Sequence, residues 1–183
     1  MASLSWTRIA RRIRVPLGFV FTAIFLWLAK PTAKSMLIGS ALIIPGLAIR
    51  ALASGHVKKN EELTMTGPYA YTRNPLYLGS MILTMGFAIS AQSWWIGVGL
   101  TVIFLGIYLP VIHGEEVFLK EHFPEFPKYA RRVPRLLPGI RSSGSSSAGA
   151  FSWDLYWKHR EYNAALGAAA LMVALAAKLF WSR

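Results

Sequence analysis

The sequence predicts an all-α integral membrane protein with about five transmembrane helices. Hydrophobic residues make up 54% of the 183 residues and charged residues only 15%, well below the roughly 25% of an ordinary soluble domain. The net charge is nevertheless +12, which in a soluble protein would indicate a nucleic-acid partner. A chain this apolar has too little polar surface for such a domain. We therefore expect no nucleic acid, and we expect the basic residues to lie in loops between membrane spans.

Five apolar stretches approach the roughly 20 residues that a helix needs to cross the hydrocarbon core. They lie, in order, at 15–31, 35–54, 75–91, 94–112 and 163–181. The first could instead be a cleaved signal peptide, but Pro31-Thr32-Ala33 is a poor cleavage sequence and further spans follow. The second is free of charge until Arg50. Only Gln92 and Ser93 separate the third from the fourth, which is typical of a tight hairpin.

We expect a single membrane domain, 1–183, in which polar segments connect the spans. Segments 56–80 and 113–140 form the candidate catalytic region. The Ser- and Gly-rich stretch 141–150 has the composition of a flexible linker. The following residues, 151–160, mix Trp and Tyr with Lys and Arg, which is typical of a segment at the level of the lipid headgroups.

The distribution of Lys and Arg predicts the orientation. With five spans, sixteen of the 20 Lys and Arg residues fall on the side of the N-terminus and four on the other side. The N-terminus is therefore expected in the cytoplasm and the C-terminus outside. All 8 Asp and Glu residues also fall on the cytoplasmic side. Because acidic residues contribute little to orientation, their clustering there indicates that the active site lies at the cytoplasmic face.

The first polar segment combines a basic residue with a predicted helix start. Pro75 can occupy the first position of the third helix, so that Arg73 lies just before a helix N-terminus. An arginine and free backbone N–H groups would attract a carboxylate or a phosphate there. The nearby aromatic rings, which could hold a flat heterocycle or a cation, are those of Tyr69, Tyr71 and Tyr77. The alternative is an interfacial aromatic belt with an arginine that reaches the headgroups.

The second polar segment contains adjacent carboxylates, Glu115 and Glu116. Neighbouring residues on a helix point about 100° apart, so at most one of them faces a given site. That residue could fix an ammonium group or an arginine while the other meets solvent. The alternative is a solvated helix with Glu116 and Lys120 as an i,i+4 pair.

We expect no metal site. The chain has no cysteine, and its four histidines form no spacing that is typical of metal ligands. They are His56, His113, His122 and His159.

Three strings, in this order, resemble the isoprenylcysteine carboxyl methyltransferase family, whose layout the phospholipid N-methyltransferases share. The strings are Thr66-Gly-Pro-Tyr-Ala-Tyr-Thr-Arg-Asn-Pro-Leu-Tyr-Leu-Gly79, Glu115-Glu116-x-x-Leu119 and Tyr129-x-x-Arg132-Val-Pro-Arg135. The resemblance covers about residues 56–140. It implies an integral membrane enzyme that uses S-adenosylmethionine and releases S-adenosylhomocysteine.

The resemblance also implies residue roles. The residues that it assigns to the cofactor are Leu63, Gly67 and Tyr69 at the nucleoside end, and Arg73, Asn74, Tyr77 and one of Glu115 or Glu116 at the amino-acid end, with Pro75, Tyr129 and Arg135 completing the site. The residues that it assigns to catalysis are Arg73, Glu116 and Arg132. Arg132 and Arg135 would close the pocket or meet an anionic group of the substrate. Asn74 stands where the family usually has histidine, which excludes a general base at that position.

The predicted acceptor is a lipophilic or prenylated molecule, either an isoprenylcysteine-like carboxylate or a small lipid, which enters from the bilayer. A carboxylate acceptor needs no base, whereas a protonated amine would need Glu115 or Glu116. Two other functions remain as alternatives. One is a non-enzymatic membrane scaffold, and the other is a small transporter subunit, which we disfavour because the spans lack the buried ionisable residues that transporters use.

Overall fold

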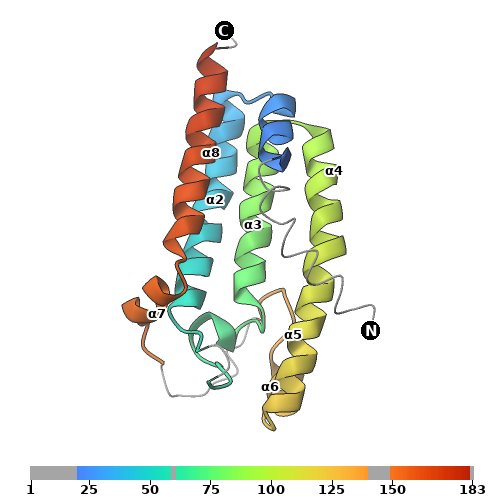
Figure 1. The fold of residues 1–183 in the computed structure, drawn as a ribbon, viewed down its shortest axis with the longest axis vertical. Coiled ribbons are helices and arrows are strands. Elements are labelled where there is room, and N and C mark those ends of the chain that lie inside the picture. Colours follow the sequence, from blue (N-terminus) through green and yellow to red (C-terminus); the bar gives the residue numbers. More distant parts are fainter. Residues whose placement is uncertain (1–19, 59–60, 140–148, 182–183) are drawn as a thin grey trace.

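The computed structural model describes residues 20–58, 61–139 and 149–181. This part of the chain is a bundle of helices without strands (Figure 1), which confirms the prediction of an all-helical fold. The elements are α2 (Ala33–Ser54), the 3-10 turn η1 (Gly67–Ala70), α3 (Pro75–Ala91), α4 (Trp94–Ile103), the π turn η2 (Phe104–Tyr108), α5 (Leu109–His122), α6 (Phe126–Arg132), α7 (Trp153–Lys158) and α8 (Tyr162–Trp181). Residues 20–28 form a short helix before α2.

Three helices in the described part are long and apolar enough to cross a membrane. They are Ala33–Ser54, the continuous helix Trp94–His122 and Tyr162–Trp181. Pro75–Ala91 is apolar but has only 17 residues, and the first predicted span lies partly outside the described residues. The helix that begins at Trp94 continues ten residues past 112, where we expected the span to end. Most of the polar residues after 112 favour a helix, and so the chain leaves the apolar region without a break.

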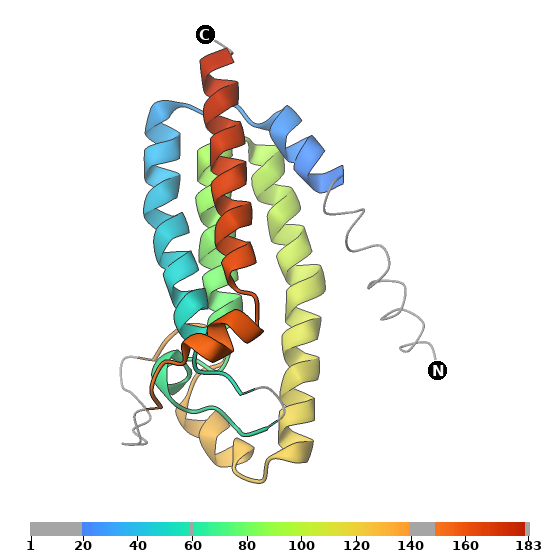
Figure 2. The same ribbon diagram turned by 60° about the vertical axis from the view of Figure 1, so that its left-hand side comes forward.

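Helices α2 and α3 run side by side in opposite directions (Figures 1 and 2). Their backbones approach closely through glycines of both helices. A Cβ atom on Gly46 would lie 2.8 Å from the backbone nitrogen of Leu83, and one on Gly86 would lie 2.7 Å from the carbonyl oxygen of Gly39. Small residues drive helix association in a bilayer, where burial of apolar surface contributes little. This pair forms the centre of the bundle.

The first helical stretch, α4 and α8 pack against this pair through a shared apolar core. Its buried members include Phe25, Ile43, Phe87, Ile96 and Leu175, which come from the first helical stretch, α2, α3, α4 and α8. Lys178, the single charge of the fifth predicted span, donates hydrogen bonds to the carbonyl oxygens of Leu26 and Trp27 (3.0 Å for the latter). It thereby satisfies carbonyls that have no helical partner at the C-terminal end of that first stretch.

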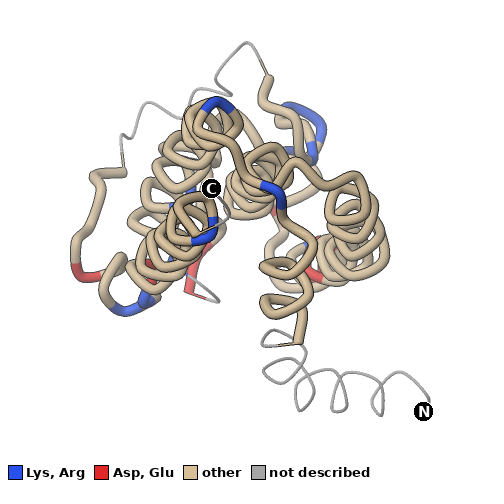
Figure 3. Tube along the Cα trace, turned by 90° about the horizontal axis from the view of Figure 1, so that it is seen from above, with Lys and Arg blue, Asp and Glu red and all other residues tan. Residues whose placement is uncertain are grey.

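Charged positions are sparse along the helices, as a view down the bundle shows (Figure 3). The acidic residues lie on α5 and α7, immediately before α6 and α8, or in the segment that precedes η1. These elements gather at one end of the bundle (Figure 1), which we call the polar end. The predicted linker, 141–150, lies almost entirely outside the described residues.

Candidate functional site

Two segments that are sixty residues apart in sequence pair at the polar end. The backbone N–H of Arg73 donates to the carbonyl oxygen of Pro134 (2.9 Å), and that of Gly139 donates to the carbonyl oxygen of Tyr71 (2.8 Å). The hydroxyl of Thr72 donates to the carbonyl oxygen of Leu136 (2.9 Å). The chain after α6 therefore folds back along the residues that lead into α3, which brings the first and third strings of the sequence pattern together.

Glu116 of α5 lies where these segments meet, and its side chain is only 8% exposed. Its Oε1 atom lies 3.1 Å from Nη1 of Arg73, and its Oε2 atom accepts hydrogen bonds from Nη2 (2.6 Å) and Nε (2.9 Å) of Arg135. Asn74 donates from Nδ2 to the carbonyl oxygen of Arg135 (2.9 Å) and lies 3.4 Å from Oε1 of Glu116. We call Arg73, Asn74, Glu116 and Arg135 the Glu116 cluster. Two guanidinium groups against one carboxylate leave it with a net charge of +1.

This burial excludes one alternative that the sequence left open. A solvated helix with Glu116 paired to Lys120 is wrong, because the carboxylate of Glu116 is buried and contacts the two arginines instead. The arginines come from the loops before α3 and after α6, and only the folded chain brings them to α5.

Arg73 has a donor that the cluster does not use. Its Nε atom is buried and has no hydrogen-bond partner, while its guanidinium carbon lies 6.0 Å from the ring centre of Phe126. Buried polar atoms in proteins nearly always have a partner, and one without a partner is typical of a functional site or of a site for a ligand, water or ion. An anionic group such as a carboxylate would supply both the acceptor and the negative charge that this site lacks.

Glu115 points to a different neighbour. It is exposed, and its Oε1 atom accepts a hydrogen bond from the hydroxyl of Tyr77 (2.9 Å). The ring of Tyr77 in turn meets the ring of Tyr108 edge to face, with 5.7 Å between ring centres. The two adjacent carboxylates therefore face two different parts of the site, one buried between arginines and one exposed beside a tyrosine.

Tyr69 and Tyr129 form a buried pair below the cluster. The hydroxyl of Tyr129 donates to the carbonyl oxygen of Tyr69 (2.7 Å). Burial raises the pKa of both phenols well above the ordinary value of 10.0; for Tyr69 the neighbouring Tyr129 and Glu115 add to the increase, and for Tyr129 the nearby Arg73 partly opposes it. Both side chains are therefore neutral at physiological pH.

The other residues that the resemblance implies are distributed as follows. Gly67 begins η1 with a φ of 56°, and a Cβ atom there would lie 2.6 Å from the ring of His56, so glycine is required. Leu63 packs against the buried group Phe126, Tyr129 and Val133. Pro75 is buried at the first position of α3. Arg132 is exposed in the last turn of α6 and is not among the residues that contact Glu116.

Sequence reasoning missed a second ion pair near the polar end. Arg50 of α2 contacts Glu161 at the start of α8 through Nε and Oε1 (2.6 Å) and donates to the hydroxyl of Ser80 on α3. The two side chains are 22% and 11% exposed. Arg50 is thus a partly buried, ion-paired residue within a predicted span, although it is not among the buried residues. Arg50 is the first charge after an apolar run, which marks it in the sequence as unusual. Its partner could not be predicted in the same way, because Glu161 lies 111 residues away.

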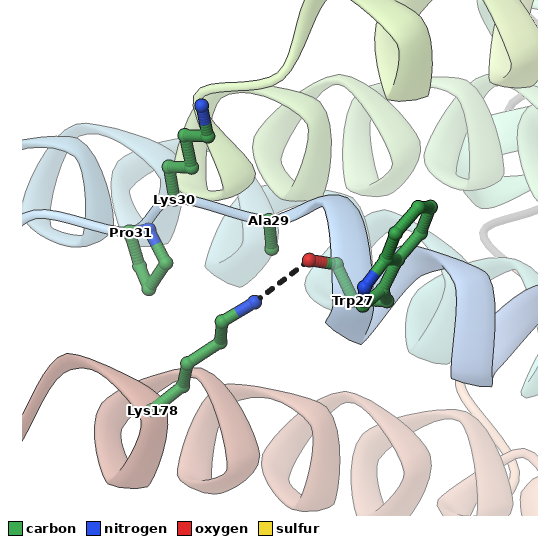
Figure 4. Close-up of a pocket in the computed structure, with 5 residues that line it drawn as sticks. All are labelled: Trp27, Ala29, Lys30, Pro31 and Lys178. Carbon is green, nitrogen blue, oxygen red and sulfur yellow. Dashed lines mark hydrogen bonds between the residues drawn. The ribbon is translucent and has the colours of Figure 1, made fainter. Parts of the chain in front are cut away.

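Two hollows lie away from the cluster. One, of about 340 Å³, lies at the opposite end of the bundle and is lined by Trp27, Ala29, Lys30, Pro31 and Lys178 (Figure 4). The figure shows Lys178 reaching the carbonyl of Trp27, whereas Lys30 extends away from it. The other, of about 380 Å³, lies on α4 and is lined by Trp94, Gly97, Val98, Thr101 and Val102. No residue of the Glu116 cluster lines either hollow.

Comparison with known proteins finds a family match over the region that contains most of the Glu116 cluster. Residues 36–125 match the phospholipid methyltransferase family. The chain is 36% identical over 90 residues to the nickel-cobalt-cadmium resistance protein NccN of Alcaligenes xylosoxydans xylosoxydans, a match that covers 49% of this chain and 42% of that protein. It is 33% identical over 99 residues to the cobalt-zinc-cadmium resistance protein CzcN of Cupriavidus metallidurans, covering 54% and 44%.

The chain thus matches less than half the length of each of these curated relatives. No solved structure matches it. Arg73, Asn74, Glu115 and Glu116 lie inside the region that matches the family, whereas Arg135 follows it. Residues 36–125, just under half of this chain, are thus similar to the phospholipid methyltransferase family.

Proposed function

We propose that the chain is an S-adenosylmethionine-dependent membrane methyltransferase whose active site is the Glu116 cluster and the tyrosines beside it. The observation that carries this proposal is the convergence of Arg73, Asn74 and Arg135 on the buried carboxylate of Glu116, with the buried Nε atom of Arg73 left unpaired. Three of these four residues lie in the region that matches the methyltransferase family.

The side chains divide into groups suited to the two ends of the cofactor, which supplies, when bound, a methyl group on a positively charged sulfur. The unpaired N–H of Arg73 and the half-exposed guanidinium of Arg135 would bind its carboxylate. The exposed carboxylate of Glu115, beside Tyr77, would bind its ammonium group. The residues that would line the nucleoside are Leu63, Gly67 and Tyr69. Neutral, buried phenols are suited to this role because they add aromatic surface without charge.

Glu116 then acts as a positioning residue. Its two oxygens hold Arg73 and Arg135 in place, which leaves Glu115 as the carboxylate that can accept a proton. A protonated amine acceptor would transfer its proton to Glu115 before attack, which frees the nitrogen lone pair, whereas a carboxylate acceptor would need no base. Methyl transfer in line needs the acceptor atom about 3–3.5 Å from the methyl carbon, so the main work of these side chains is alignment.

We propose a lipophilic or amphiphilic acceptor that reaches the polar end from the bilayer. Helices long and apolar enough to cross a membrane lead directly into the site, since α5 continues the helix that begins at Trp94. The excess of Lys and Arg on the side of the polar end favours a cytoplasmic location for it. Methylation of soluble acceptors alone would contradict this part of the proposal.

The relatives named for metal resistance do not lead us to a second function. Within the described residues, no three or more His, Cys, Asp or Glu side chains are grouped so that they could hold a metal ion. A scaffold or transporter subunit would leave the convergence of Arg73 and Arg135 on the buried carboxylate of Glu116 without a role.

Titration calorimetry on detergent-purified protein tests the proposal. The native protein should bind S-adenosylmethionine and S-adenosylhomocysteine, and Arg73→Ala should lower the affinity at least tenfold because it removes a charged hydrogen-bond donor. Arg131→Ala is the matched control, since Arg131 is exposed on α6 and should leave the affinity unchanged. Absence of binding by a folded native protein would overturn the proposal.

A further inference from the structure

The helix that carries the two carboxylates is interrupted by a π turn. At η2, Phe104–Tyr108, the backbone N–H of Leu109 donates to the carbonyl oxygen of Phe104, five residues earlier. Pro110 follows directly, and proline has no N–H for the carbonyl of Gly106 and clashes with it in a regular helix. A wider turn before the proline relieves this conflict. Turns of this kind are rare and are found frequently at functional sites.

The π turn changes which face of the helix meets the bundle. Ile96 of α4 is 3% exposed, and Ile112 of α5 is 1% exposed. Sixteen residues separate them, so in an uninterrupted α-helix their side chains would point about 160° apart at about 100° per residue. A π turn contains one extra residue and takes up about 100° of that difference. Both side chains can therefore be buried by the same bundle.

The contacts of the site follow from this rotation. Glu116 lies one turn after Ile112 and meets the two arginines. Tyr108, the last residue of η2, and Glu115 lie two turns apart on one face, and both contact Tyr77. Without the extra residue, α5 would present a different face to α3 and to the loop after α6.

We propose that η2 is a positioning element of the site and that Tyr108 is its positioning residue. The π turn sets the register of α5 so that Glu116 meets Arg73 and Arg135, while the ring of Tyr108 holds Tyr77 against Glu115. The effect on cofactor binding rests on the proposed function, whereas the register of α5 does not depend on it.

Changes in chain length at Gly106 test the register. Gly106 has no side chain and faces open space, since a Cβ atom there would meet nothing within 4 Å. Deletion of this residue therefore removes no side-chain contact. Deletion, combined with Pro110→Ala to remove the clash of the proline ring with the preceding turn, should convert η2 into a regular α-helix and keep Ile112 buried, whereas insertion of one alanine after Gly106 should rotate Ile112 outward. In a helix without a π turn, deletion and insertion would both rotate it.

Because the chain has no cysteine, the rate at which a single Cys reacts with a small thiol reagent reports this rotation. Ile112→Cys should react slowly in the native and deletion backgrounds and at least tenfold faster in the insertion background. Val111→Cys, an exposed neighbour, marks the fast limit in the native background. Fast reaction of Ile112→Cys after deletion, or slow reaction after insertion, would overturn the proposed register.

Substitutions at Tyr108 test the contact to Tyr77 and need no change in chain length. Tyr108→Leu should weaken binding of S-adenosylhomocysteine about two- to tenfold, the usual range for loss of an aromatic pair, while Tyr108→Phe should retain it. Combining Tyr108→Leu with Tyr77→Phe should cost less than the two effects added together. Leu105→Ala, on the exposed part of the same turn, is the control.

The outcomes separate the two proposals. Additive effects of Tyr108→Leu and Tyr77→Phe, or a lower melting temperature of Tyr108→Leu with unchanged affinity, would show that Tyr108 has a structural role only. If the native protein binds no cofactor, the proposed function fails, and the cysteine reactivities still decide the register of α5.

Discussion

Helices α2 and α3 are held together differently from the long helix that runs from α4 to α5. In the first pair, glycines bring the two backbones into contact. In the long helix, Gly97, Gly99 and Gly106 face open space, and only 11% of its most apolar window is buried, against 22% for α2. The long helix meets the bundle at Ile96, and at the polar end through Tyr108, Glu115 and Glu116.

The difference separates what holds the fold from what holds the site. Close backbone contact between α2 and α3 depends on shape, which is insensitive to pH and salt. The position of α5 depends on charges, hydrogen bonds and aromatic edges, which are sensitive to both. Substitutions in the first region should therefore change stability, and those in the second should change ligand affinity as well.

The largest effect is expected from Glu116→Gln, which retains the shape of the side chain and removes its charge. Two guanidinium groups would then face each other around a neutral amide, and breaking a buried ion pair in this way costs about 3–5 kcal/mol. Cofactor affinity should fall at least tenfold because Arg73 and Arg135 are no longer held in place.

Thermal unfolding and calorimetry measure both effects. Glu121→Gln, at an exposed position on the same helix, is the control and should change neither. A Glu116→Gln variant with native stability and native affinity would contradict the role of the cluster in holding α5.

A smaller effect, confined to stability, is expected from Gly46→Ala. The added Cβ atom would lie 2.8 Å from the backbone nitrogen of Leu83 and 2.9 Å from the carbonyl oxygen of Gly79, and backbone atoms cannot move aside cheaply. Such overpacking costs about 1–3 kcal/mol. The matched control is Gly99→Ala on α4, where a Cβ atom meets nothing within 4 Å and which should be neutral or slightly stabilising. Equal melting temperatures for the two variants would remove the contrast between the two regions.

Alkaline pH should lower the stability of the polar end. The expected loss lies between those for Gly46→Ala and Lys158→Gln. Since burial raises the pKa of Tyr69 and Tyr129 above 10.0, the unfolded chain releases these protons at a lower pH than the folded protein does. The resulting stability is fully present below about pH 10 and is lost as the pH rises above it. Tyr129→Phe should lower stability by about 1 kcal/mol at pH 8, through loss of one hydrogen bond, and should make the decline between pH 9 and 11 shallower. Melting curves across this range measure both; an unchanged slope would contradict the assignment.

The smallest effect is expected from Lys158→Gln. The pair of Lys158 and Glu61 (3.2 Å) is 64% and 59% exposed, and exposed ion pairs contribute about 0–1 kcal/mol. The melting temperature should remain within about 4 °C of the native value at this effect size. A larger loss would mean that α7 is fixed to the segment before η1 by charge, as α5 is fixed to the arginines.

The helices could be predicted from the sequence because long apolar runs leave the backbone few alternatives in a bilayer. Particular residues show where this reasoning stops. The resemblance singled out Arg73, Glu115 and Glu116, but the pairing of Glu116 with Arg135 depends on the loop after α6, which folds back on Arg73. The pair of Arg50 and Glu161 joins the second span to the last, a contact that no local pattern encodes.

The π turn could be predicted from the sequence only in part. Pro110 within an apolar run was visible and indicates an irregular helix. It does not say whether the helix kinks, ends or widens, since that choice depends on which face the bundle buries at Ile96 and at Ile112. The register of Glu115 and Glu116 was therefore left open by the sequence and is fixed by tertiary packing.

Methyl transfer from S-adenosylmethionine carrying a labelled methyl group tests the central claim most directly. Native protein in vesicles made from a total lipid extract should move label into the solvent-extractable lipid fraction. Glu115→Gln, which removes the proposed proton acceptor and ammonium ligand, should lower the rate at least tenfold, and Arg131→Ala should leave it unchanged. Folded native protein that binds the cofactor but transfers no label to the lipid fraction would contradict the proposed lipophilic acceptor, and native protein that neither binds the cofactor nor transfers label would contradict the account as a whole.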